Sequence, residues 1–316
     1  MFGEGFLVDI WNGSYTEPII LSAQEKVVKA RLERHVNRLA SEIGIRNTAK
    51  PDALEAAARY IENTFREVGL EVRSQQFHCA DGTKARNIEA VIYGHDPIVP
   101  CLIVGAHYDS VNCPGANDNA SAVAALLEVA RVISEIGKPR HTIRFVAFAN
   151  EEPPYFGSDD MGSWVYARDC VHEKKDALGM ICLEDIGYYC TEPGSQTMPH
   201  PINAIYGNDV GNFVAICGNS ESRDLVASVL RSFRSHCDFP AEGLAAPEKL
   251  IPDITLSDNM SFWRAGIKAV MITDTVYLRY PHYHQVTDTA DKLSYPAFAR
   301  VTRGLCDTVW TLINSD

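Results

Sequence analysis

The chain has 316 residues, of which 46% are hydrophobic and 22% are charged, a composition typical of a globular protein. Its formal net charge is −12 and it has no block rich in Lys or Arg, which argues against a nucleic-acid surface. No apolar run reaches the length of about 18 residues that a membrane-spanning helix needs. The first residues do not form a basic and then apolar leader, and we expect a cytoplasmic protein.

The nine cysteines fit this expectation. Several lie inside apolar runs, as Cys101, Cys182 and Cys217 do, where a free cysteine behaves as a small hydrophobic residue. No Cys-x-x-Cys pair occurs, so we expect no thiolate zinc site. The cysteines are therefore expected to be reduced and buried.

Apolar residues at helical spacing predict helices over residues 22–43, 51–68, 120–136, 222–235 and 295–314. Short apolar runs between them predict strands at 72–77, 88–93, 101–106, 143–149, 178–183, 213–217 and 269–272. Strands that are apolar along their whole length are typical of the centre of an α/β sheet, where helices cover both faces. We therefore predict one α/β domain over residues 21–316, with a mostly parallel or mixed central sheet and helices on both faces, after an irregular arm over residues 1–20.

Acidic and imidazole side chains follow three of the predicted core strands. Ligands of open α/β sheets bind beyond the carboxyl ends of the strands, so these side chains are expected to meet at one edge. The three groups are His107-Tyr108-Asp109, Asn150-Glu151-Glu152 and Glu184-Asp185. Two further groups, Gly115-Ala116-Asn117-Asp118-Asn119 and Tyr283-His284 with Asp288-Thr289, lie before the helix at 120 and late in the chain.

Carboxylates and imidazoles gathered at one edge repel or desolvate each other unless a cation compensates. Mixed nitrogen and oxygen ligands suit Zn²⁺ better than Mg²⁺ or Ca²⁺, and Mn²⁺ or Co²⁺ would also fit. The sequence therefore predicts a zinc site at this edge.

Each motif has a simpler interpretation when it is taken alone. His107 and Asp109 point to the same side of a strand, so Asp109 can fix the imidazole tautomer, but such a pair can also be an ordinary surface hydrogen bond. Asp118 can cap the helix at 120. One of Glu151 and Glu152 can bind metal while the other takes a proton from water, and the spacing does not say which does which. His282 competes with His284, and Asp185 alone can be a loop carboxylate.

Taken together, the motifs resemble those of the M28 family of zinc aminopeptidases, which also contains glutaminyl cyclases. The resemblance runs from about Arg31 to the C-terminus and is carried by segments 105–110, 115–121, 150–152, 183–187 and 283–289. It implies a zinc exopeptidase-like fold with two Zn²⁺ per chain and a cis peptide bond after Asp118.

The resemblance also implies a role for each site residue. His107 and Asp185 would complete different metal ions, Asp118 would bridge both, and Glu152 and His284 would be the remaining ligands. Glu151 would be the general base and Asp109 would orient His107. The family spacing between the last histidine and Asp-Thr selects His284 over His282.

The resulting expectation is a metal-dependent exopeptidase that acts as an aminopeptidase on peptide or aminoacyl substrates. One alternative is a glutaminyl cyclase-like acyltransferase with a single zinc, which would need only Asp118, Glu152 and His284. Another is an inactive binding module of the same fold. The chain departs from many family members at Asn259, where they carry His, and in residues 153–161, which lengthen the segment after Glu152.

Overall fold

One mixed β-sheet organises the chain. A computed structural model describes residues 6–9, 15, 18–96, 100–172, 176–204, 206–207 and 209–315. Within these ranges the strand order is β1-β8-β7-β9-β6-β4-β5-β3-β2. The strands are β1 (Leu7–Asp9), β2 (Glu71–His78), β3 (Lys84–Ile92), β4 (Cys101–His107), β5 (Ile143–Phe148), β6 (Ala177–Glu184), β7 (Val214–Asn219), β8 (Ala241–Ala246) and β9 (Ala269–Thr273). The central strands β5, β4, β6 and β9 run parallel, so their carboxyl ends meet at one edge.

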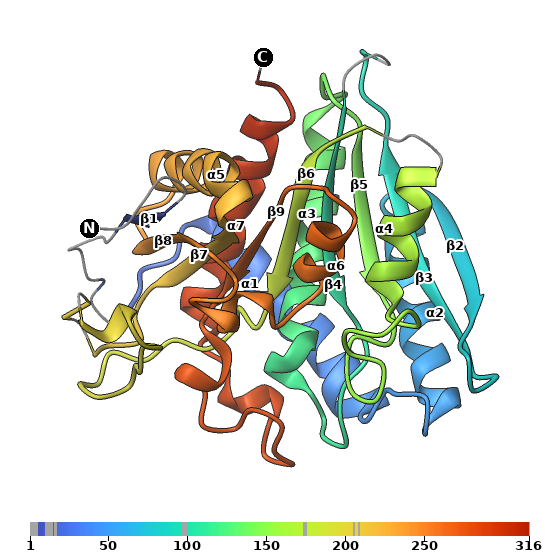
Figure 1. The fold of residues 1–316 in the computed structure, drawn as a ribbon, viewed down its shortest axis with the longest axis horizontal. Coiled ribbons are helices and arrows are strands. Elements are labelled where there is room, and N and C mark those ends of the chain that lie inside the picture. The colour runs from blue at the N-terminus through green and yellow to red at the C-terminus, as the bar shows by residue number, and fades with distance from the viewer. Residues whose placement is uncertain are drawn as a thin grey trace.

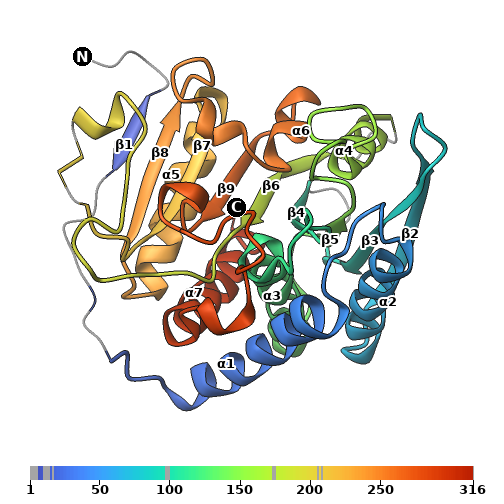
Figure 2. The same ribbon diagram turned by 90° about the horizontal axis from the view of Figure 1, so that it is seen from below.

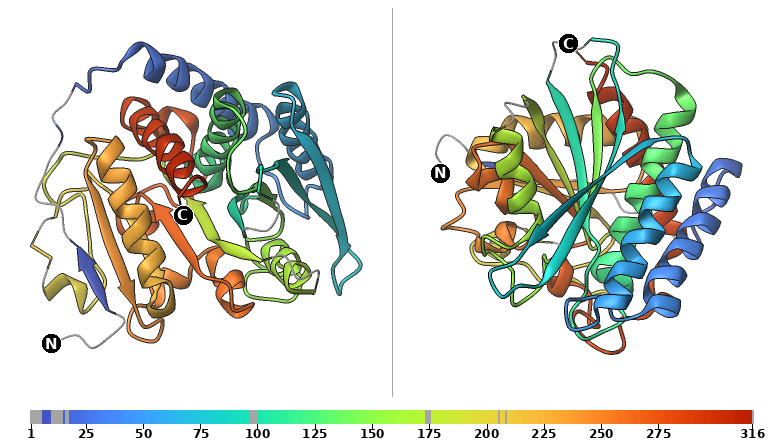
Figure 3. Two further views of the ribbon diagram at one scale, coloured as in Figure 1. Left: turned by 90° about the horizontal axis from the view of Figure 1, so that it is seen from above. Right: turned by 90° about the vertical axis from the view of Figure 1, so that its right-hand side faces the viewer.

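Helices cover both faces of this sheet. They are α1 (Ala23–Val36), α2 (Pro51–Glu67), α3 (Ala122–Ile136), α4 (Gly162–His172), α5 (Arg223–His236), α6 (Asn259–Arg264) and α7 (Tyr295–Leu312). Figure 1 shows α4 and α6 in front of the sheet, and Figure 2 shows α1, α3 and α7 together on the opposite side. The views in Figure 3 show the same two layers from above and from the side. The α/β fold with helices on both faces is therefore as predicted.

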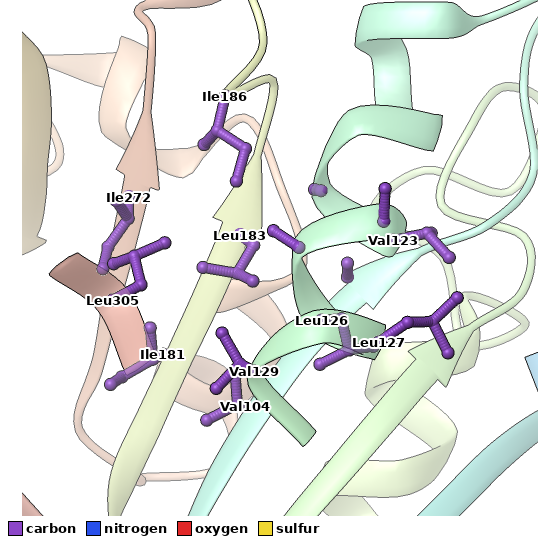
Figure 4. Close-up of a cluster of buried hydrophobic side chains, with 14 of the residues drawn as sticks. Val104, Val123, Leu126, Leu127, Val129, Ile181, Leu183, Ile186, Ile272 and Leu305 are labelled. Atoms are coloured by element: carbon purple, nitrogen blue, oxygen red, sulfur yellow. The ribbon is translucent and has the colours of Figure 1, made fainter. Parts of the chain in front are cut away.

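The larger core lies between the sheet and the layer that contains α3 and α7. In Figure 4, Leu126 and Val129 of α3 face Val104 of β4 and the side chains of Ile181 and Leu183 on β6. Every residue of β4 is buried, which explains why its sequence is apolar throughout instead of alternating. Truncating a fully buried leucine such as Leu126 to alanine would cost about 2–5 kcal/mol.

The first predicted helix is confirmed, with one local change. It begins at Ser22, whose side chain accepts from the Glu25 N–H while the Glu25 side chain accepts from the Ser22 N–H. After α1 the chain continues as a π-helical segment, Asn37–Ile43, and ends at Gly44, whose φ of 77° suits glycine.

Four of the described strands and α-helices are absent from the sequence prediction. They are β1, β8, α4 and α6. The sequence of β8 is Ala-Glu-Gly-Leu-Ala-Ala, which has no β-branched or aromatic residue and therefore little strand signal. β1 lies inside the arm that we expected to be irregular and pairs with β8; residues 1–5, 10–14 and 16–17 of that arm lie outside the described residues.

Two expectations about the whole chain can be compared with the fold. Seven of the nine cysteines are buried, as expected. Within the described part of the chain, no helix combines the length and the apolarity that crossing a bilayer requires.

Candidate metal centre

His107 ends β4 on the sheet face that carries α4 and α6. Its Nε2 lies 3.4 Å from Asp118 Oδ1 and 3.4 Å from Glu184 Oε2. Both the imidazole and these carboxylates are buried. The three side chains place one ligand atom each within 4.8 Å of one another, which is a spacing that a metal ion can bridge.

A second group of the same kind shares Asp118. Nε2 of His284 lies 3.0 Å from Asp118 Oδ2 and 3.4 Å from Glu152 Oε2. Asp118, Glu152 and His284 again offer ligand atoms within 4.8 Å of one another. Because the two oxygens of Asp118 face different histidines, this carboxylate joins the two groups. The peptide bond between Asp118 and Asn119 is cis, as the family resemblance implies.

Asp185 stays a predicted ligand beside a second candidate, Glu184. Glu184 belongs to the group of ligand atoms around His107. Glu184 is the last residue of β6 and shares a sheet face with Cys182 and His107, whereas Asp185 follows the strand with a φ of 41°. Both carboxylate oxygens of Asp185 are buried without a hydrogen-bond partner. A metal ion would supply a partner for these oxygens, so the prediction for Asp185 stands beside the candidate Glu184.

Asp109 connects the two sides of the centre. One of its oxygens lies 3.5 Å from His107 Nδ1, and its two oxygens accept from the main-chain N–H groups of Glu151 and Glu152, each at 3.1 Å. Asp109 can therefore orient the imidazole and also hold the turn that carries the two glutamates. Glu151 is buried with Oε2 3.8 Å from His107 Nε2, and it belongs to neither metal-binding group.

The turn that carries Asp118 is held by Asp288. The Asp288 carboxylate accepts from the main-chain N–H groups of Asn117 and Asp118, at 2.9 and 3.2 Å, and from the Tyr280 hydroxyl at 2.7 Å. Asp288 of the late Asp-Thr motif therefore positions the turn that carries Asp118.

Arg46 is a residue of the centre that the sequence reasoning missed. Its guanidinium is fully buried and donates to the main-chain carbonyls of Tyr108, Pro114 and Gly115, among others, so it holds the loop between His107 and Asp118. A single arginine in a loop gives no sequence signal for such a role.

The electrostatics of the centre call for a cation. Burial raises the pKa of Glu151 well above its ordinary value; His107 opposes the rise, and the charges of Glu152 and Glu184 add to it. Burial, followed by the neighbouring Asp118, raises the pKa of Glu152 to about 7. Burial lowers the pKa of His284, but the neighbouring carboxylates of Asp118 and Glu152 outweigh this and raise it to about 10. Carboxylates that are buried close together are costly to ionise, and a bound divalent cation stabilises their charged form.

The buried nitrogen atoms of the histidines support the same conclusion. Nε2 of His107 and Nε2 of His284 are buried and have no hydrogen-bond partner. Buried polar atoms normally have a partner, and a metal ion is one. Neutral imidazoles with carboxylates form a ligand set that suits Zn²⁺. The residues present therefore fit two metal ions that share Asp118.

Comparison with known sequences gives a consistent result. A model of peptidase family M28 matches residues 87–309. YfbL, an uncharacterized protein of Escherichia coli (strain K12), is 38% identical over 87% of this chain and 85% of its own length. Leucine aminopeptidase 1 of Arthroderma otae is 26% identical over 61% of this chain and 49% of its own length.

Solved structures share the fold. The aminopeptidase from Aneurinibacillus sp. strain AM-1 superposes with a TM-score of 0.70 at 17% identity, covering 93% of this chain and 96% of the other. A glutaminyl cyclase from Bacteroides thetaiotaomicron superposes with a TM-score of 0.65 at 18% identity, covering 90% and 97%. At these identities the similarity shows a shared fold only, and this fold occurs in both the aminopeptidase and the cyclase.

Proposed function

The chain belongs to peptidase family M28, and we propose that it is an aminopeptidase that holds two zinc ions and removes N-terminal residues from peptides. The observation that carries the proposal is the pair of carboxylate–histidine groups that share Asp118. His107 with Asp185 or Glu184 would complete one metal ion, and Glu152 and His284 the other.

The chemistry follows from the placement of the side chains. Zinc at these positions would polarise the scissile carbonyl group and lower the pKa of the attacking water. Glu151 would accept the proton of that water and later deliver it to the leaving amine. Asp109 would hold Glu151 through its main-chain N–H and keep His107 in position.

Two other functions of the same fold are less well supported. A cyclase with one metal ion would need only the group formed by Asp118, Glu152 and His284. The fold similarity to a glutaminyl cyclase is the observation that favours this function. The complete group around His107 favours two metals instead. An inactive binding module would be expected to lack a ligand or the base, and every such residue is present here.

The test combines metal analysis with substrates. Protein saturated with zinc and freed of excess metal should contain about two zinc ions per chain and hydrolyse aminoacyl amides. A peptide with N-terminal glutamine should be cleaved and not cyclised. One firmly bound zinc with cyclisation of that peptide would establish the cyclase function instead.

A further inference from the structure

Arg279 carries a buried positive charge in the segment that follows β9. The residue is 6% exposed, and a Cβ added at Gly211 would lie only 2.8 Å from Arg279 Cδ, so the arginine side chain is closely packed. Its Nε donates to Gln196 Oε1 at 2.7 Å, and its Nη1 donates to the Phe213 carbonyl at 2.8 Å. Both acceptors are neutral, and within the described part of the chain Arg279 forms no ion pair.

Asp274 offsets the charge of Arg279 only from a distance. Burial lowers the pKa of the Arg279 guanidinium, and the largest opposing effect comes from the charge of Asp274. The oxygens of Asp274 are engaged elsewhere. Oδ2 accepts from the Asn117 amide at 2.9 Å and from the Tyr188 N–H at 2.8 Å, and Oδ1 accepts from the Val276 N–H at 3.2 Å. A buried charge without a direct partner strongly destabilises a fold, so the guanidinium calls for a further partner.

The Tyr189 hydroxyl is a second donor beside Arg279 that lacks an acceptor. Arg279 Nη2 and the Tyr189 hydroxyl are both buried, and no described residue offers either of them a hydrogen-bond partner. The guanidinium carbon lies 5.6 Å from the centroid of the Tyr189 ring and 4.5 Å from that of Phe213. Buried polar atoms are normally satisfied by protein groups, by water or by an ion. A cation and a hydroxyl group that both have spare hydrogen atoms suit an anion.

We propose that Arg279 and Tyr189 bind a small monovalent anion, which is chloride in ordinary salt solutions. One negative charge balances the guanidinium, and the anion accepts hydrogen bonds from Nη2 and from the Tyr189 hydroxyl. The close packing of Gly211 and Phe213 on the arginine side chain favours a compact ion over an organic acid. The site does not depend on the proposed peptidase function, and its tests do not measure activity.

The melting temperature of the zinc-loaded protein tests the site. It should be higher in sodium chloride than in sodium gluconate at the same ionic strength, because gluconate is too large for the site and equal ionic strength removes differences in screening. Above the dissociation constant, each tenfold rise in chloride should add about 2–4 °C. Bromide should replace chloride. Equal melting temperatures in chloride and gluconate would overturn the proposal and would fit a water molecule at Nη2.

Crystals grown in sodium bromide locate the ion. An anomalous difference peak should lie between Arg279 Nη2 and the Tyr189 hydroxyl. Anomalous signal confined to exposed lysine and arginine side chains would contradict the assignment. A peak at Arg279 in a protein whose melting temperature does not respond to chloride would contradict it as well.

Two tyrosine variants provide a matched comparison. Tyr189→Phe removes one proposed donor and keeps the ring that packs on Phe239, so it should lower the affinity for chloride by about 10–100-fold, the usual effect of losing a hydrogen bond to a charged group. Tyr166→Phe is the control, since Tyr166 is also buried but its hydroxyl donates to Glu89. Arg279→Gln should abolish the response to chloride. Should that variant fail to fold, the tyrosine variants still decide, and equal chloride affinity in both would refute the site.

Discussion

The hydroxyl group of Ser257 donates to Oε2 of Glu184 at 2.6 Å, and this oxygen is the one nearest to His107. The amide of Asn119 donates to the same oxygen at 3.1 Å. The carboxylate is therefore oriented before any metal binds. Groups that orient metal ligands in this way are typically worth 10–100-fold in metal affinity.

Ser257→Ala should therefore weaken zinc binding at one of the two proposed positions by about 10–100-fold and leave the other unchanged. Zinc titration with a competing chelator would measure both affinities. Ser261→Ala is a suitable control, because Ser261 is buried nearby in α6 but bonds to Ser163 and not to Glu184. Equal affinities in both serine variants would show that Ser257 has no role in holding the ligand.

Glu184 and Asp185 should respond differently to the loss of charge. Asp185→Asn should lower the zinc content towards one per chain and reduce activity strongly, because both of its buried oxygens lack the partner that a metal ion would supply. Glu184→Gln should reduce the zinc content less, since Ser257 and Asn119 already donate to Glu184 Oε2. Metal analysis of both variants decides between the two carboxylates, and a loss of zinc in Glu184→Gln alone would make Glu184 the ligand.

Much of this arrangement could be predicted from sequence because its signals are local. The apolar runs before His107, Glu151 and Glu184 are visible as runs, and the rule that ligands gather at strand ends then brings them together. That rule alone does not choose between Glu184 and Asp185, because both follow the same apolar run; only the family resemblance selects Asp185. Arg46 was not predictable either, since its partners are main-chain carbonyls brought near only by the fold.

The neighbouring glutamates should be separable by charge removal. Glu151→Gln should keep its metals while turnover falls by ~10²–10⁴-fold, the range typical of a lost proton acceptor. Glu152→Gln should lose zinc from the group that contains His284, and added zinc should restore part of the activity. Bound zinc and kcat measured side by side test this, and the reverse pattern would exchange the two roles.

Arg46 is expected to be essential to the fold around the centre. Arg46→Met would leave several buried carbonyl groups without a donor, each costing about 1–3 kcal/mol, so the free energy of unfolding should fall by at least about 3 kcal/mol. Urea denaturation measures the change. Arg38→Met is the control, because the Arg38 side chain is 43% exposed and its pairing with Glu42 should contribute little. Equal stability of the Arg46 variant and the unmodified protein would refute the role.

A buried ion-pair cluster outside the metal centre should make the free energy of unfolding depend on pH in acid. Glu128 of α3 has a side chain with no exposed surface, is hydrogen-bonded by Arg31, and lies 3.1 Å from Arg131 Nη2 and 3.6 Å from His35 Nε2. Burial alone would raise the pKa of Glu128, but the neighbouring His35 and the hydrogen bonds from Arg31 and Arg131 outweigh it and lower the pKa to about 2.

Because the folded-state pKa lies below the unfolded value of 4.5, the contribution of Glu128 is complete above that value and is lost as the pH falls towards about 2. The stability difference between the unmodified protein and Glu128→Gln should therefore shrink by on the order of 2 kcal/mol between about pH 6 and pH 3. Urea denaturation of metal-free protein at both pH values measures it and keeps zinc release out of the comparison. Glu135→Gln lies on the same helix and also pairs with Arg131, but its side chain is 63% exposed, so its effect should be small at both pH values. A Glu128→Gln difference that stayed constant with pH would mean that the cluster does not depress the pKa of Glu128.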